Sequence, residues 1–412
     1  MNFDVFNFHP AVATGILKAG YATPTPIQAE AIPPIMQQRD VMGRAQTGTG
    51  KTAAFVLPIL HQLVGQPQAK SQKNRTRALI LAPTRELAEQ INQAINDLGS
   101  ETRIKCAAVY GGVSIVAQIQ KLKQADIIVA CPGRLLDHIN RRTVNLSRLQ
   151  MLVLDEADMM LDMGFLPDVK KVLSALPPKR QTMLFSATIP AEIRKLSREI
   201  LRDPVTVRIG MTAPAETVRH AIYPVARHLK TALLLDLLKT TPTQSVLVFT
   251  RTKYSAQKLE KKLTGAGFSS ASLQGNLSQV KRQAALDGFR KGRFQILVAT
   301  DIAARGIDVT RVSHVINYDI PSTPEAYIHR IGRTGRADRN GEAFTLVTGE
   351  DRQMVNAINR VIGTNIEQRT LASFNYKTPA GPGIDSPARP PKPFRKFPKR
   401  RKTSGRRCAA AC

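Results

Sequence analysis

A short apolar run leads directly into three acids in Met151-Leu152-Val153-Leu154-Asp155-Glu156-Ala157-Asp158. Such a run is typical of a buried strand in a parallel sheet that is covered on both faces. Open α/β sheets bind ligands beyond the carboxyl ends of their strands, so the run delivers Asp155 and Glu156 to a binding edge. It therefore predicts an α/β fold with a functional site at this edge.

A glycine-rich segment upstream has the form of a phosphate-binding loop. It runs Ala45-Gln46-Thr47-Gly48-Thr49-Gly50-Lys51-Thr52, with Ala45 where the common fingerprint has glycine. Gly48 and Gly50 allow a bend in which several backbone N–H groups point at one anion. The segment is therefore expected to cradle the phosphates of a nucleotide.

Four side chains in these two motifs divide the expected chemistry between them. Lys51 would contact the β- and γ-phosphates of ATP, while Thr52 and Asp155 would hold Mg²⁺. Glu156 would orient and deprotonate the attacking water. Gly-Lys-Thr alone is a common chance match, and an Asp-Glu pair alone usually marks a solvated helix face. Together and in this order they predict ATP hydrolysis.

Length and composition agree with a large protein that has no membrane-spanning segment. The 412 residues suggest two or three domains, and 42% of them are hydrophobic. No apolar stretch reaches the roughly 20 residues of a membrane span. The first ten residues contain no Lys or Arg, unlike a secretory signal. The four cysteines have neither metal-ligand nor disulfide spacing, so a reduced, cytoplasmic location is expected.

The charge balance predicts a polyanionic partner. The formal net charge is +29, and the last 36 residues contain eleven Lys or Arg against one acid, Asp385. Proline and glycine recur in this tail and preclude a packed core. Phe394 and Phe397 lie among the basic residues, where they could stack on bases. Nucleic-acid contact is favoured over a tail that is only a solvated end, although net charge alone does not choose between the two.

Apolar strand-like runs followed by polar clusters occur in two successive blocks. The first block contains residues 78–81, 126–129, 151–154 and 182–185, and the second contains 246–249, 294–298, 315–318 and 344–347. A stretch with Pro204, Gly210 and Pro214 separates the blocks without sustained periodicity. The expected organisation is a first domain at 1–205, a linker at 206–218, a second domain at 219–370 and a disordered basic tail at 371–412.

The polar clusters closely resemble the ordered motifs of the DEAD-box RNA helicases over residues 1–370. The first block carries residues 20–28 (GYATPTPIQ), 83–88 (PTRELA), 111–112 (GG), 132–134 (PGR), 155–158 (DEAD) and 186–188 (SAT). The second carries 248–250 (VFT), 279–282 (QVKR), 299–308 (ATDIAARGID) and 329–336 (HRIGRTGR). The compact core and short basic tail look most like the bacterial RhlE-type subgroup. The resemblance implies two tandem RecA-like domains with parallel sheets.

The resemblance also assigns residues to the nucleotide. The Gln28 amide matches the N6/N7 edge of adenine, which would favour ATP over GTP. Phe3 and Tyr21 would pack near the base, with a role as core aromatics equally open. Asp308 would bind the ribose. Arg333 and Arg336 would act as arginine fingers, rather than as surface arginines that pair with acids. Residues implied to couple nucleotide, RNA and the two domains are Asp158, Ser186, Thr188 and His329, although a lone histidine is more often structural.

RNA contacts are implied on loops that follow the strands. The first-domain positions are Pro83, Thr84, Arg85, Gly111, Gly112, Gly133 and Arg134. The second-domain positions are Arg251, Gly275, Asn276, Arg282, Thr300 and Asp301. Glycine N–H, hydroxyl and guanidinium groups suit phosphate and ribose oxygens, so binding would ignore base sequence. Two residues depart from the family pattern: Cys131 replaces a common threonine, and Gln274 replaces a frequent histidine.

The expected function is a non-processive, ATP-dependent RNA helicase that binds single-stranded RNA and short duplexes. Two alternatives remain at this point: an ATP-gated RNA clamp or chaperone with little strand separation, and a DNA translocase. The family motifs weigh against DNA. Ribosomal precursors and RNA-decay machinery are candidate partners, and a monomer is expected. The basic cluster at residues 399–402 would suit a nuclear signal in a eukaryote, but the absence of further extensions favours a bacterial cytoplasm.

Overall fold

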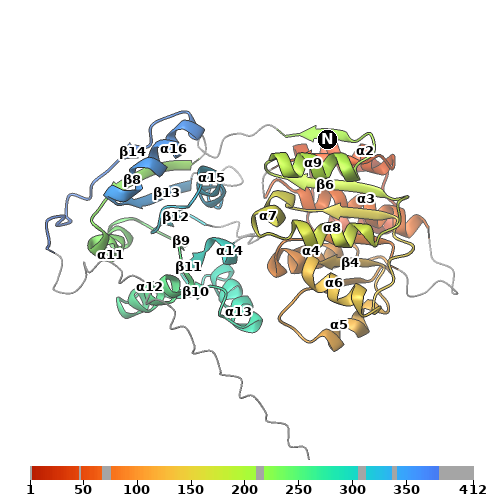
Figure 1. Cartoon of the computed structure of the whole chain (residues 1–412), viewed down its shortest axis with the longest axis horizontal. Coiled ribbons are helices and arrows are strands. Elements are labelled where there is room, and N and C mark those ends of the chain that lie inside the picture. Colours follow the sequence, from red (N-terminus) through yellow and green to blue (C-terminus); the bar gives the residue numbers. More distant parts are fainter. Residues whose placement is uncertain are drawn as a thin grey trace, which may run out of the picture. The chain divides into compact units, whose positions relative to one another are not determined.

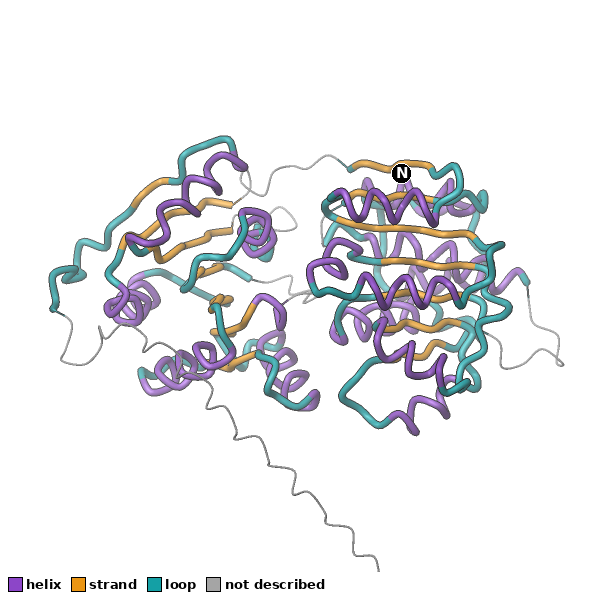
Figure 2. The backbone as a smooth tube through the Cα atoms, in the orientation of Figure 1, coloured by secondary structure: helices purple, strands orange, loops and turns teal. Residues whose placement is uncertain are grey.

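The computed structural model describes residues 2–45, 48–66, 76–209, 218–304, 312–335 and 341–379. Within these residues the chain forms two parallel β-sheets of seven strands, each covered by helices (Figures 1 and 2). Four of the expected site residues, Gln46, Thr47, Asp308 and Arg336, lie outside the described residues, as does the tail from residue 380 on. Among the described residues, no helix is both long enough and apolar enough to cross a bilayer.

The first sheet has the strand order β3-β4-β2-β5-β6-β1-β7. Its strands are β1 (Val41–Arg44), β2 (Ala78–Leu81), β3 (Cys106–Val109), β4 (Ile127–Ala130), β5 (Met151–Leu154), β6 (Gln181–Ser186) and β7 (Val205–Arg208). Its helices are α1 (Pro10–Lys18), α2 (Pro26–Met36), α3 (Lys51–Gly65), α4 (Arg85–Leu98), α5 (Ile115–Leu122), α6 (Pro132–Asn140), α7 (Ala157–Asp162), α8 (Leu166–Ser174) and α9 (Ala191–Ile200), preceded by a 3-10 turn at Phe3–Phe6.

The second sheet repeats this topology strand for strand, in the order β10-β11-β9-β12-β13-β8-β14. Its strands are β8 (Val218–Pro224), β9 (Val246–Thr250), β10 (Ser270–Leu273), β11 (Ile296–Thr300), β12 (His314–Asn317), β13 (Gly341–Val347) and β14 (Glu367–Gln368). Its helices are α11 (Lys230–Thr240), α12 (Lys253–Gly265), α13 (Gln279–Arg290), α14 (Asp301–Ala304), α15 (Pro324–Ile331) and α16 (Arg352–Ile362), with 3-10 turns at Arg227–Leu229 and Gly349–Asp351.

Both faces of the first sheet are buried, which explains why its central strands are apolar throughout. Ile80 and Val153 point into the core formed with α2, α3 and α4. Their neighbours Leu79 and Leu152 point to the opposite face, where they pack with residues of α8 and α9. This alternation is the two-residue period of a strand, and the helices on both faces make most positions of the central strands apolar.

The eight expected apolar runs are confirmed as strands, whereas six further strands were not predicted. β3 (CAAV) and β10 (SASL) contain mostly small residues, and β1 (VMGR) contains a glycine. β7, β8 and β14 contain charged or polar residues because they lie at or near a sheet edge. The expected linker at 206–218 began too early, since residues 206–208 complete β7 and pair with β1. Residue 218 begins β8.

Candidate functional site

The described part of the phosphate loop requires glycine at two positions. Gly48 and Gly50 have φ angles of 85° and 93°, and Gly50 is directly followed by the first turn of α3. A Cβ atom on Gly50 would lie 2.6 Å from Gln28 Nε2 and 2.8 Å from Thr25 Oγ1. Positive φ and this close approach both exclude larger side chains. The loop therefore opens onto the N-terminus of α3, where backbone N–H groups favour an anion.

Gln28 fastens this loop to the N-terminus of α2. Its Oε1 accepts a hydrogen bond from the backbone N–H of Thr25 at 2.9 Å, and its Nε2 donates to the carbonyl oxygen of Gly50 at 3.1 Å. An amide has two donor hydrogens and two acceptor lone pairs, so one of each remains for a base. The sequence suggested only the adenine contact, because the link to Gly50 spans 22 residues and depends on folding.

Replacing Gly50 by alanine is expected to weaken nucleotide binding by tenfold or more. The added methyl group meets Gln28, and the left-handed backbone costs about 1–3 kcal/mol. The matched control is Gly65→Ala at the other end of α3, where a Cβ meets nothing within 4 Å and φ is not positive. Titration of both variants with a fluorescent ATP analogue measures the effect. Equal affinities would contradict the geometric requirement at Gly50.

Lys51 presents a buried positive charge beside Asp155. Its side chain is 5% exposed, and Nζ has no hydrogen-bond partner among the described residues. Asp155 is 2% exposed and follows β5. Burial raises the pKa of Asp155 to about 6, while Lys51 opposes this shift. A buried ammonium without a partner is costly, so the pocket suits an anion that supplies the missing oxygen atoms.

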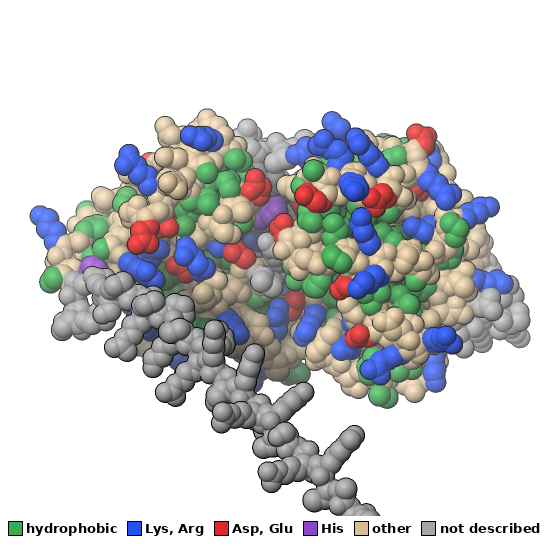
Figure 3. All heavy atoms as spheres, viewed as in Figure 1, with side chains coloured by type: hydrophobic (Ala, Val, Ile, Leu, Met, Phe, Trp, Pro, Cys, Tyr) green, Lys and Arg blue, Asp and Glu red, His purple; other side chains and the backbone are tan. Residues whose placement is uncertain are grey.

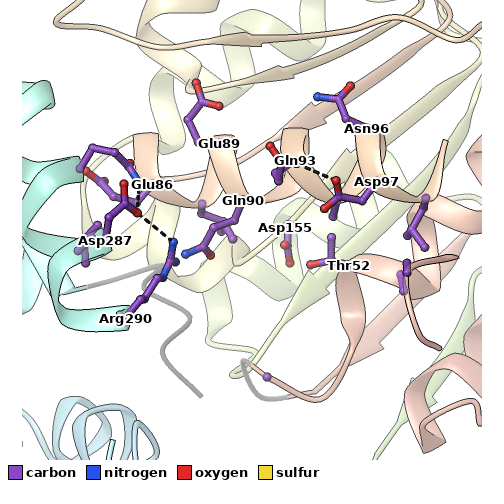
Figure 4. A pocket seen from close by; sticks show the side chains of 18 of the residues that line it. Thr52, Glu86, Glu89, Gln90, Gln93, Asn96, Asp97, Asp155, Asp287 and Arg290 are labelled. Atoms are coloured by element: carbon purple, nitrogen blue, oxygen red, sulfur yellow. Dashed lines mark hydrogen bonds and ion pairs between the residues drawn. The ribbon is translucent and has the colours of Figure 1, made fainter. Parts of the chain in front are cut away.

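Thr52 and Asp155 lie next to each other at the base of the hollow in Figure 4, below the wall formed by α4. A hydroxyl and a carboxylate are oxygen ligands of the kind that Mg²⁺ prefers. No group of three or more His, Cys, Asp or Glu side chains that could hold a metal ion occurs among the described residues. Mg²⁺ commonly binds through one or two protein groups together with nucleotide phosphates, and these two residues fit that pattern.

Glu156 occupies a strained position beside Asp155. Its φ of 52° lies in the left-handed region, which is uncommon for residues other than glycine, and its side chain is 4% exposed. Its backbone N–H donates to Asp155 Oδ1 at 3.0 Å. The turn between β5 and α7 thus places two carboxylates at the sheet edge. Backbone strain of this kind occurs preferentially at functional sites.

Three of the expected coupling residues form one hydrogen-bonded cluster. Asp158 Oδ2 accepts from both the backbone N–H and the hydroxyl of Thr188 at 2.8 Å. Ser186 Oγ accepts from the backbone N–H of Asp158 at 3.1 Å and donates to the carbonyl of Thr188 at 2.7 Å. The cluster ties the loop after β6 to the acidic motif. The fourth residue, His329, lies on α15 of the second sheet.

The two aromatic residues proposed for the base have different environments. Phe3 is 6% exposed and belongs to the hydrophobic core. Tyr21 is 37% exposed, packs edge-on against Phe3 with ring centroids 6.1 Å apart, and lines the same hollow as Gly50. Phe3 is therefore a core aromatic that supports Tyr21, and the exposed Tyr21 ring is the one available to a ligand.

Arg85, Gly112 and Arg134 come together although they lie in three separate motifs. Gly112 has a φ of 82°, and a Cβ atom there would overlap the Arg85 guanidinium. The Arg134 guanidinium donates to the carbonyl of Val113 at 3.0 Å. Gly111 lies next to both arginines. These groups follow β2, β3 and β4, three adjacent strands whose carboxyl ends form one edge of the sheet.

Gln118 organises this edge and was missed in the sequence. It is 4% exposed, and its Nε2 donates to the carbonyl of Tyr110 at 2.9 Å. Its Oε1 accepts from Arg134 at 3.2 Å and is 3.1 Å from Nε2 of the buried His138. Gln118 thus connects the loop after β3 with α6. A glutamine in the middle of a helix carries no sequence signal for such a role.

The remaining first-domain positions lie at the starts of two helices, α4 and α6. Thr84 caps α4, because its hydroxyl accepts the backbone N–H of Leu87 at 3.2 Å, and Pro83 precedes it. Gly133 lies in the first turn of α6. Cys131 is the N-cap residue of α6 but makes no capping hydrogen bond through its side chain. Burial raises the pKa of this thiol to about 12, so it behaves as an apolar group.

Gln274 has a clear role in the second sheet. It is 2% exposed, and its Oε1 accepts from the backbone N–H of Asn276 at 2.6 Å, which holds the turn before α13. Asn276 in turn accepts from Lys253 Nζ at 2.9 Å. Gly275 lies between them, and a Cβ atom there would meet nothing within 4 Å. The exposed Arg251 follows β9, and its backbone N–H donates to Asp319.

Asp301 is bound to another protein residue. Its two carboxylate oxygens accept from Arg330 Nε at 2.6 Å and Nη2 at 2.7 Å. Arg330 is 3% exposed, donates also to Asn317 Oδ1 and the carbonyl of Asp319, and lies 4.9 Å from the centre of the Phe249 ring. The primary role of Asp301 in this structure is therefore to pair with a buried arginine.

Replacing Asp301 by alanine is expected to destabilise the second sheet by about 3 kcal/mol, since it leaves Arg330 buried without its counter-charge. The matched control is Glu367→Ala, which removes an ion pair of the same 2.6 Å length to Arg369 at an exposed position. An exposed pair contributes about 1 kcal/mol or less. Urea unfolding compares the two variants. A stable Asp301→Ala protein with weak RNA binding would instead favour the direct RNA role.

The last three expected site residues of the second sheet lie at or near the ends of β11, α13 and α15. Thr300 ends β11 and Arg282 lies in the first turns of α13. Arg333 follows α15, is 8% exposed, and donates through its backbone N–H to the carbonyl of Arg330 at 3.1 Å. The hydroxyl of Thr334 donates to the carbonyl of Val312 at 2.6 Å and fixes the segment after Arg333.

Comparison with known proteins agrees with this geometry. Residues 25–196 match the DEAD/DEAH box helicase family, and residues 229–338 match the helicase conserved C-terminal domain. The chain is 41% identical over 360 residues to the DEAD-box ATP-dependent RNA helicase CshA of Bacillus subtilis, covering 87% of this chain and 72% of that one. The chain belongs to the DEAD-box ATP-dependent RNA helicases.

Other members of the family give the same result. This helicase is 40% identical to RhpA of Helicobacter pylori, over 91% of this chain and 75% of that one. It is 40% identical to DeaD of Buchnera aphidicola, of which it spans 62%. A structure of Saccharomyces cerevisiae Dbp5 bound to RNA and ADP BeF3 superimposes with a TM-score of 0.79 at 32% identity, over 89% of this chain and 94% of that one. Both parallel sheets therefore have the RecA-like helicase fold.

Proposed function

We propose that this helicase binds single-stranded RNA without regard to base sequence and separates short duplexes locally, using Mg²⁺ and ATP. The observation that carries the proposal is the buried Lys51 ammonium, which has no hydrogen-bond partner among the described residues and lies beside Asp155. The arginine and glycine groups after β2, β3 and β4 support a backbone contact at the same sheet edge.

The residues divide the reaction as follows. Lys51 would bind the β- and γ-phosphates, and Thr52 and Asp155 would hold Mg²⁺, which would neutralise phosphate charge. Glu156 takes a proton from the attacking water, and its strained backbone sets the direction of the carboxylate. Arg333, with Arg336, stabilises the charge that develops on the γ-phosphate. Gln28 and Tyr21 bind the adenine.

RNA would be held through its sugar-phosphate backbone. Arg85 and Arg134 supply guanidinium groups for phosphates, and the glycines beside them let the strand come close to the protein backbone. Such contacts ignore base identity, and contacts to the 2′-hydroxyl would select RNA over DNA. The favoured outcome of these contacts is local strand separation; an RNA clamp with little strand separation is the alternative.

Several finer features belong to the same proposal. We expect a monomer that acts in the cytoplasm on ribosomal precursors or with RNA-decay machinery. The compact core and the short basic tail favour an RhlE-type subgroup, while the relatives named above are CshA, RhpA and DeaD proteins. A single-stranded RNA extension should be captured more strongly by the intact chain than by one lacking the tail, because tail charges add phosphate contacts.

One pair of assays tests the proposed function. ATP hydrolysis is measured with and without RNA, and strand displacement is measured on short RNA, DNA and mixed duplexes, with Lys51→Ala as the inactive control. We expect hydrolysis to be slow alone and strongly stimulated by RNA, and displacement to require an RNA strand. Stimulated hydrolysis without displacement would identify a clamp. Equal turnover with and without RNA would contradict the proposal.

A further inference from the structure

A row of exposed basic side chains lies at the β7 edge of the first sheet, at the opposite end of the strand order from β3. We call it the basic edge; it consists of Arg44, Arg194, Lys195, Arg198, Arg202 and Arg208. α9 packs its apolar side, with Ile193 and Leu196, into the core on the face of β1 that contains Met42. Figure 3 shows Lys and Arg side chains gathered over α9 and along this edge.

The fold brings like charges together at both ends of β7. Parallel pairing places Arg44 opposite Arg208, and both side chains are exposed at the carboxyl end of the strands. At the amino end, burial and the neighbouring Arg202 lower the pKa of Arg180. The Nε atom of Arg180 is buried and has no hydrogen-bond partner among the described residues. Like charges directly opposite each other destabilise a sheet, and a bound anion would reduce this repulsion.

Nearby acids neutralise only part of the basic edge, and the exposed Glu192 of α9 is the acid in the same helix as Arg194, Lys195 and Arg198 that has no ion pair of its own among the described residues. Glu199 pairs with Lys170 at 3.3 Å, and Asp203 pairs with Arg39 at 3.3 Å. Asp40 is buried and accepts backbone N–H groups at both carboxylate oxygens, and its charge opposes the lowering of the Arg180 pKa without reversing it. Over the described part of the chain, Arg194, Lys195, Arg198 and Arg208 form no ion pair with an acidic side chain. The edge therefore keeps its positive charge for a partner.

We propose that the basic edge is a second RNA-binding surface, which holds the phosphate backbone of a strand that extends beyond the ATP-dependent site. The inference rests on the proposed function, because it concerns the same substrate. A protein partner would need apolar or aromatic anchors in pockets. Among the described residues, no large hydrophobic side chain of α9 or β7 is exposed, and Val207 of β7 is buried. A phosphate backbone needs only positive charge and donors.

The two surfaces are far enough apart to be tested separately. Arg85 follows β2, which is four strands from β7 in the sheet order. At a strand spacing of about 4.8 Å this separation is about 19 Å. An RNA of about four nucleotides spans only about 14 Å at roughly 3.4 Å per nucleotide, so it cannot contact both surfaces, whereas a long strand can occupy both. Linked contacts of this kind raise affinity through effective concentration.

The test compares two triple variants of the full chain. Arg194→Gln, Lys195→Gln and Arg198→Gln remove three exposed charges from α9, and Lys258→Gln, Lys261→Gln and Lys262→Gln remove three exposed charges from α12 as the matched control. We expect the α9 variant to bind an RNA of about 40 nucleotides about tenfold more weakly. Its log–log salt slope should fall by about 2, at roughly 0.7 per lost contact.

A short RNA separates this proposal from the function on which it rests. Binding of an RNA of about four nucleotides with an ATP analogue, and ATP hydrolysis saturated with that RNA, should be unchanged in the α9 variant, because a strand of about 14 Å is too short to contact both surfaces. If RNA does not stimulate ATP hydrolysis, the proposed function is refuted but the basic-edge proposal is not. Binding of the long RNA without nucleotide still measures the contribution of the basic edge. Thermal unfolding checks the fold, and Arg208→Gln provides a milder second variant.

Three results would overturn the proposal. Equal losses in the α9 and α12 variants would show general electrostatic attraction. Loss of short-RNA binding in the α9 variant, with an unchanged unfolding midpoint, would place α9 in the ATP-dependent site. Unchanged RNA binding combined with lost binding of polyglutamate would identify the partner as an acidic protein segment.

Discussion

Replacing Arg333 by alanine is expected to slow ATP hydrolysis by about 10³-fold or more, the scale typical of an arginine finger. The reason is that the planar guanidinium meets charge that develops on the γ-phosphate only as the bond breaks. ATP affinity should therefore change much less than the rate. Single-turnover hydrolysis at saturating RNA, together with nucleotide titration, measures both quantities.

Two variants sharpen this prediction. Arg333→Lys keeps the charge but loses the two-pronged geometry, so its rate should lie between those of the wild type and the alanine variant. Arg360→Ala removes an exposed arginine from α16 of the same sheet and should hydrolyse ATP normally. If Arg333→Ala hydrolyses ATP at the normal rate but binds RNA weakly, Arg333 serves RNA rather than the phosphate.

Glu156→Gln is expected to slow hydrolysis by about 10²-fold to 10⁴-fold, the usual contribution of a general base. ATP and RNA should remain bound, because Lys51 and Thr52 are unchanged and glutamine fills the same volume. The complex should therefore accumulate in its ATP-bound form. Quenched-flow hydrolysis and RNA retention in the presence of ATP measure the two effects.

The control for Glu156→Gln is Glu30→Gln, which makes the same chemical change at an exposed position on α2. It should leave hydrolysis unaffected. Near-normal turnover in Glu156→Gln would show that another group activates the water. Simultaneous loss of ATP binding would show that Glu156 supports the nucleotide site rather than the chemical step.

The family and the ATP chemistry were predictable from local sequence patterns. The loop from Gly48 to Thr52 and the run from Met151 to Asp158 each carry their geometry in consecutive residues. Glycines with positive φ and a strand followed by acids need no distant partner to be recognised. The central apolar strands were equally clear, because burial on both faces requires continuous hydrophobic residues.

Edge and short strands could not be found in this way. β7 and β14 contain charged residues because one side of each faces solvent, and β3 and β10 contain mostly small residues and only one large aliphatic side chain each. Their pairing depends on neighbours that are distant in the chain. The start of the linker was therefore predicted too early, inside β7, because β7 can be recognised only from its pairing with β1.

The amino-acid sequence alone was enough to establish an ATP-hydrolysing helicase of the DEAD-box family, because its motifs are contiguous. Folding was needed to reveal what each polar side chain binds: Gln28 holds Gly50, Asp301 pairs with Arg330, and Gln118 joins two loops. It also placed Arg44 beside Arg208 at the sheet edge. Hydrogen bonds and like-charge contacts between distant residues are set by strand order and register, which no local pattern contains.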